Sequence, residues 1–157
     1  MVTVRQLEDP AILARAADDW AAALANPDPY RSFVAHHTMY SRTWERYLVD
    51  LRLRACSPEA AIAFLEVDPW CLWSGYVKQK VMRYVSRFNH SPADRRRLQE
   101  VVVAVTQKGP RREFSETALL AKRVWDPEFG HELRQLAESV PETRAAVDRL
   151  FKKRFTR

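Results

Sequence analysis

The sequence of 157 residues contains little glycine, little cysteine and no long apolar run. Its three glycines, Gly75, Gly109 and Gly130, are too far apart to build the glycine-rich loops that cradle phosphates. Classical nucleotide binding is therefore not expected. The longest stretch without a charged residue covers the ten residues 32–41, about half of the roughly 20 that are needed to cross a bilayer. We therefore predict that the chain does not span a membrane.

The first residues and the cysteines favour a cytoplasmic protein. The first residues, MVTVRQLEDP, lack a basic segment followed by an apolar run, so no secretory signal is expected. The two cysteines, Cys56 and Cys71, do not have CxxC spacing, and reduced thiols are favoured over a disulfide or a metal pair. The segment HELRQ at 131–135 has glutamine where the zinc-protease pattern has its second histidine. We expect neither a metal nor another cofactor.

Positive charge is concentrated in the last two-thirds of the chain. The net charge is +6, but residues 1–50 carry five arginines and seven acids, a net charge of −2. Residues 51–157 carry twenty-one basic and thirteen acidic residues, a net charge of +8. Such a field attracts polyanions and accelerates their encounter. The favoured partners are therefore the phosphate backbone of nucleic acid or an acidic protein surface.

Prolines mark the expected helix starts. Six of the nine follow an aspartate or a serine, which is the chemistry of a capping side chain followed by proline at the first helical position. Apolar residues then recur at spacings of three and four. About eight helices are predicted, over 10–25, 30–54, 58–67, 68–88, 92–108, 111–124, 127–138 and 142–154. The run VVVAV at 101–105 has strand propensity, but a lone strand would lack a partner, so helix is predicted there as well.

The fold class predicted from this pattern is all-α, in a single domain over 1–157. Pro58, Pro92 and Pro127 are 34 and 35 residues apart, and each opens the first helix of a pair. Residues 57–157 would then form three stacked antiparallel helix pairs, and residues 1–56 would form N-terminal cap helices. An irregular helical bundle is the alternative that the same pattern allows.

Two segments resemble the second helix of HEAT-like repeats. They are SGYVKQKVMRYVSRF at 74–88 and TRAAVDRLFKKRF at 143–155, in which a small or polar entry precedes alternating apolar and basic residues. The resemblance covers residues 57–155, although the period is short for HEAT units. It implies an α-solenoid that binds proteins or nucleic acid.

Basic residues cluster by helix and form the main candidate site. If the pairs stack, the second helices line one surface and their cations form a stripe on it. The candidate residues are Lys80, Arg83, Arg87, Arg95, Arg96, Arg97, Arg111, Arg112, Arg149, Lys152 and Lys153, with Lys78 and Arg154 on the same helices. We expect a non-enzymatic binding module, or a small subunit of a larger assembly, that uses this surface.

Other interpretations stay open. Arg31 and His36 resemble the Arg-x4–6-His motif of HEPN-type ribonucleases, which implies a dimeric, all-helical ribonuclease, although Ser32 departs from the motif. A protein-directed adaptor that uses Trp70 and Trp73 is a third possibility.

Two further groups of side chains receive structural interpretations. Glu113 and Glu116 are predicted to be solvated partners of nearby basic residues on a helix surface. Core packing is favoured over base stacking for Trp73, Tyr76 and Trp125.

Overall fold

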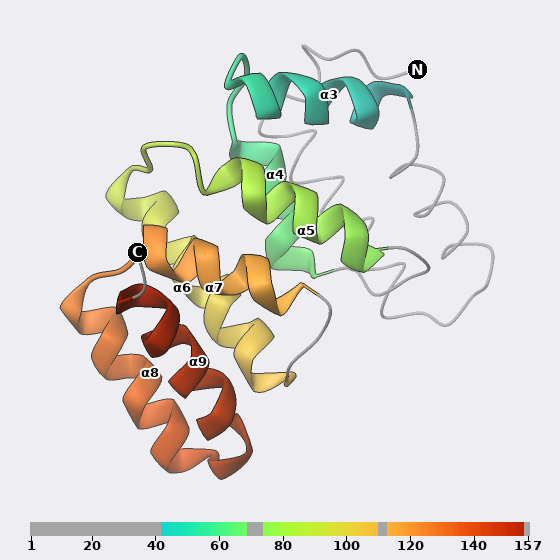
Figure 1. The fold of residues 1–157 in the computed structure, drawn as a ribbon. Helices are drawn as coiled ribbons and strands as arrows, with labels where there is room; N and C mark the ends of the chain where they lie inside the picture. Colours follow the sequence, from blue (N-terminus) through green and yellow to red (C-terminus); the bar gives the residue numbers. More distant parts are fainter. Residues whose placement is uncertain (1–41, 69–73, 110–112, 156–157) are drawn as a thin grey trace. The chain divides into compact units, whose positions relative to one another are not determined.

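The computed structural model describes residues 42–68, 74–109 and 113–155 (Figure 1). These residues form helices and turns and include no strand, so the predicted all-α fold with about eight helices is confirmed. Within these ranges, no helix has both the length and the apolar character that crossing a membrane requires. The elements are α3 (Arg42–Leu53), α4 (Glu59–Val67), α5 (Ser74–Val85), α6 (Pro92–Gln107), α7 (Phe114–Arg123), α8 (Pro127–Ser139), the 3-10 helix η2 (Pro141–Thr143) and α9 (Arg144–Phe155).

The chain divides into two compact units, Met1–Val77 and Lys78–Arg157. Their charges are opposite. The first unit has seven basic and ten acidic residues, a net charge of −3, and the second has nineteen and ten, a net charge of +9. The prediction of one domain over 1–157 stays a prediction. All of the basic candidate residues belong to the second unit.

In the first unit, the hydroxyl group of Tyr47 joins α3 to the start of α4. It donates to the carbonyl oxygen of Ser57 and accepts from the amide of Ala61, each at 3.0 Å. Tyr47 is 1% exposed, and the ring of Trp44 lies between it and Phe64, with centroids 5.3 and 5.1 Å away. A buried hydroxyl group needs both a donor and an acceptor, and here it has both. The tyrosine therefore fixes the connection between the two helices.

Two helix starts in the second unit, those of α6 and α8, follow the predicted capping chemistry. The hydroxyl oxygen of Ser91 accepts from the amide of Asp94 at 3.1 Å, and Pro92 begins α6. The carboxylate of Asp126 accepts from the amide of Phe129 at 2.8 Å, and Pro127 begins α8. Helix α6 runs through the VVVAV segment, and three of its valines, at 101, 102 and 105, are buried. Both predicted helix starts and the helical prediction for VVVAV are confirmed.

The helices of the second unit pack against one another. Helix α6 packs on α7, α8 on α9, and α7 on α9 (Figure 1). Side-chain contacts join α5 to α7 between residues 33 and 35 positions apart, and α6 to α8 between residues 36 apart. The predicted pairs over 92–124 and 127–154 therefore lie next to each other.

An aromatic cluster supports the last pair. The ring of Trp125 lies edge-on to Phe129 of α8 at 5.7 Å and to Phe151 of α9 at 4.9 Å. A Cβ atom at Gly130 would lie 2.9 Å from the same indole ring, so the helix approaches Trp125 this closely only because residue 130 is glycine. Trp125 is thus part of the packing, as predicted.

Candidate binding surface

The interface between α5 and α7 contains paired charges at two levels. We call it the α5–α7 interface, and its residues are Lys78, Met82, Arg83, Glu113, Glu116 and Thr117. The Nζ atom of Lys78 lies 3.9 Å from Oε1 of Glu113, and both side chains are no more than 2% exposed. At the edge, Nη2 of Arg83 lies 2.6 Å from Oε1 of Glu116, and this hydrogen bond, together with the attraction between the two charges, raises the pKa of the guanidinium group. Every one of these charges thus has a partner of opposite sign.

Two sequence interpretations are corrected at this interface. Glu113 was expected to be a solvated surface acid and Lys78 to belong to the basic surface, but both are buried. The reason is their position, because Lys78 shares a helix face with Val81, Met82 and Val85, which are also buried. A buried charge requires a partner of opposite sign, and Lys78 and Glu113 are partners of each other.

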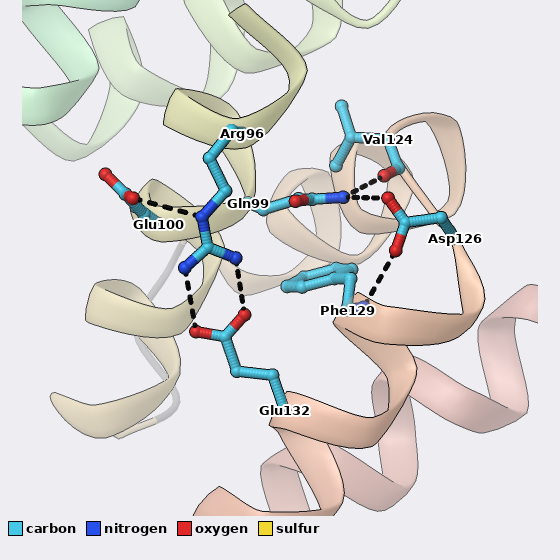
Figure 2. Close-up of polar contacts among 7 residues, drawn as sticks. All are labelled: Arg96, Gln99, Glu100, Val124, Asp126, Phe129 and Glu132. Carbon is cyan, nitrogen blue, oxygen red and sulfur yellow. Dashed lines mark hydrogen bonds and ion pairs between the residues drawn. The ribbon is translucent and has the colours of Figure 1, made fainter. Parts of the chain in front are cut away.

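The cations in the first turns of α6 are also largely paired. Arg96 contacts Glu132 of α8 through Nη1 at 2.7 Å and Glu100 through Nε at 3.2 Å (Figure 2). The hydrogen bond to Glu132 and the charge of that carboxylate raise the pKa of Arg96. Arg97 lies 3.4 Å from Asp94. These contacts offset the unfavourable interaction of cations with the N-terminal end of a helix dipole.

Next to this cluster, Asp126 and Gln99 together link α6, the end of α7 and the start of α8. Its Oδ1 atom accepts from the amide of Phe129, and its Oδ2 atom accepts from Nε2 of Gln99 at 2.7 Å, while the same Gln99 nitrogen donates to the carbonyl oxygen of Val124 at 2.9 Å (Figure 2). Burial raises the pKa of Asp126, but the Phe129 amide, the Gln99 side chain and the positive charge of Arg95 outweigh burial and lower it. The carboxylate is therefore held in its charged form.

On α5, the remaining candidate cations have different surroundings. The guanidinium carbon of Arg87 lies 5.7 Å from the centroid of the Tyr84 ring, in a cation–π arrangement. The side chain of Lys80 is exposed, as is that of Arg95 on α6. None of these three residues lines the hollow described next.

Between α7 and α9 lies an open hollow of about 300 Å³. We call it the α7–α9 groove, and its lining residues are Phe114, Ser115, Ala118, Arg149, Lys152 and Lys153. The three cations, all from α9, are exposed, whereas Phe114 and Ala118 are buried at 7% and 5% exposure. Among the residues that the structure describes, the lining includes no acid. The groove thus combines an apolar floor with a rim of positive charge.

The residues of the groove lie about 35 positions further along the chain than those of the α5–α7 interface. Phe114 and Arg149 are 35 residues apart, as are Ala118 and Lys153, and the same separation relates Lys78 to Glu113. At the earlier position acids match the cations, whereas at the later position Ser115 and Ala118 lie across from them. The described members of the predicted site therefore include an ion-paired group (Arg83, Arg96, Arg97) and a groove-lining group (Arg149, Lys152, Lys153).

Several predicted residues lie outside the described ranges. They are Arg111 and Arg112 of the basic site, the ribonuclease pair Arg31 and His36, and the adaptor residues Trp70 and Trp73. Their roles stay predictions. Within residues 42–68, 74–109 and 113–155, no group of three or more histidine, cysteine or acidic side chains could hold a metal ion.

Comparison with known proteins identifies no relative, so a function can be proposed only from the geometry of the described residues. No protein-family model matches the sequence, and no significant match exists among curated proteins or solved structures. The resemblance to HEAT-like repeats therefore stays a prediction.

Proposed function

We propose that this protein is a non-enzymatic binding module that holds an anionic macromolecule, either the backbone of a nucleic acid or an acidic protein, on the basic surface of its second unit. One observation carries the proposal: the α7–α9 groove brings the exposed cations Arg149, Lys152 and Lys153 together beside an apolar floor. Exposed cations that lie together on one surface attract an incoming anion jointly, and such complementary charge favours its binding.

The charge of the whole unit supports this function. A net charge of +9 over residues 78–157 produces a long-range field that favours the approach of a polyanion and increases its association rate. Salt screens that field within about 10 Å at 0.1 M. Binding should therefore weaken steeply as the salt concentration rises.

The test is a titration of three labelled polyanions, a generic DNA duplex, a single-stranded RNA and polyglutamate, at about 50 and about 200 mM salt. We expect at least one to bind at low salt and to lose affinity at high salt. The variant Arg149→Glu/Lys153→Glu should abolish most of the binding. The control Lys108→Glu/Lys122→Glu makes the same change in net charge at exposed positions outside the groove, and it should bind more tightly than the groove variant. Equal affinity of the two variants, or no binding of any polyanion, would refute the proposal.

A further inference from the structure

The composition of the α7–α9 groove also identifies the kind of polyanion. We infer that it takes an acidic segment of a partner protein in which one large apolar side chain is flanked by carboxylates. This inference rests on the proposed function and chooses between its two classes of ligand. Its argument comes from the floor of the groove and from the spacing of the rim.

The floor suits an apolar side chain. Phe114 and Ala118 form it, and Ser115 lies beside them at the surface. A phosphate backbone would place no group there, and bases stack on exposed aromatic faces, whereas Phe114 is only 7% exposed. The volume of about 300 Å³ is at the lower end for small-molecule pockets, which span roughly 300–1,000 Å³. A hollow of this size accommodates a side chain better than a cofactor.

The rim suits carboxylates. Arg149, Lys152 and Lys153 are three and four positions apart, so they lie on one face of α9 within about one helical turn. Acids at the same spacing in a partner helix would lie opposite them, with the apolar side chain between. Phe114 and Ser115 form the first turn of α7, where the helix dipole also favours negative charge. Charge complementarity and the apolar floor thus call for the same amphipathic, acidic ligand.

The probe is a labelled, glutamate-rich helical peptide with a single leucine at its centre, measured beside the same peptide with alanine in place of leucine. Burying the leucine should make the first peptide bind wild-type protein roughly tenfold more tightly than the second. The variant Ser115→Trp fills the groove without changing charge, and it should remove this difference while the fold, followed by circular dichroism, is kept. Ala145→Trp, at an exposed position of α9 outside the groove, is the matched control and should preserve the difference.

Other outcomes overturn the inference in distinguishable ways. Equal binding of both peptides, with Arg149→Glu/Lys153→Glu still abolishing it, would leave the proposed function intact and exclude the apolar contact. Groove-dependent binding of DNA or RNA with no binding of either peptide would assign the surface to nucleic acid. Self-association that Ser115→Trp prevents, without peptide binding, would assign it to a second copy of the chain. If no polyanion binds the protein, the proposed function and this inference are both refuted.

Discussion

The α5–α7 interface and the α7–α9 groove share helix α7, yet different side chains surround the cations in the two regions. At the first, Lys78 and Arg83 face Glu113 and Glu116. At the second, three cations of α9 face apolar and small residues of α7. The comparison teaches that the number of cations on a helix does not define a binding surface. The residues that the neighbouring helix places beside those cations differ between the two regions, with acids at the first and with Phe114, Ser115 and Ala118 at the second.

The strongest test of this contrast breaks the buried pair. Glu113→Ala leaves the ammonium group of Lys78 without its carboxylate partner in a buried position, so we expect a loss of about 3–5 kcal/mol in unfolding free energy. The double variant Lys78→Met/Glu113→Leu should recover most of that loss, because it removes both charges and keeps the apolar volume. Urea unfolding followed by circular dichroism measures both. A loss below about 1 kcal/mol for Glu113→Ala would mean that the pair is hydrated.

Removing the cap of α8 should have the next largest effect. Asp126→Ala removes the acceptor for the amide of Phe129 and one acceptor for Gln99, so we expect a loss of about 1–2 kcal/mol. Ser91→Ala, which removes a cap that accepts one backbone amide, should lose less. A larger loss in Ser91→Ala than in Asp126→Ala would contradict the role of Asp126 in linking segments.

The stabilisation that the Asp126 carboxylate provides should depend on pH. Because the folded state lowers the pKa of Asp126, the unfolded chain binds more protons at acidic pH. The stabilisation is therefore present above the ordinary carboxyl pKa and is lost as the pH falls through the lowered value. The difference in unfolding free energy between wild type and Asp126→Ala should accordingly shrink from about pH 5 to about pH 3.

The exposed pair between α6 and α8 should contribute less than the buried one. A double-mutant cycle with Arg96→Ala and Glu132→Ala should give a coupling of about 0.5–1 kcal/mol, since the contact is bidentate but half-exposed. Adding salt should reduce the coupling, because exposed charges are screened. A coupling unchanged at about 1 M salt would indicate that the contact is dry.

The smallest effect on stability is expected in the groove. Arg149→Ala/Lys153→Ala changes two exposed side chains, so the unfolding free energy should change by no more than about 0.5 kcal/mol. Ligand affinity should nevertheless fall. A loss comparable to that of Glu113→Ala would show that these residues support the fold, and the contrast between the two regions would disappear.

The regular features of the fold could be predicted from the sequence because they are local. Ser91 and Asp126 cap the helices that follow them, and the apolar spacing identified α6 despite the strand propensity of VVVAV. The contacts that join α5 to α7 link residues 33 and 35 positions apart, close to the 34 and 35 residues between the prolines. Each of these signals lies within one helix or repeats from one pair to the next.

The pairing of charges could not be predicted in the same way, because the partners lie 33 to 36 residues apart. Sequence alone places Arg83, Arg96 and Arg149 in one class, and only the packing of neighbouring helices separates them. A local signal did exist for Lys78, which interrupts a face that is otherwise apolar. That interruption indicates a buried partner, but it does not identify which acid supplies it.

The burial of Lys78 makes its amine a chemical reporter of conformational opening. Acylating reagents modify accessible amines, so they should modify Lys152 and Lys153 in the native protein at once. Lys78, with 0% exposure, should react only at the rate at which α5 separates from α7. Mass spectrometry of time-resolved acylation would therefore measure the local opening of this interface, in the presence or absence of a ligand. It needs no substitution and no attached label.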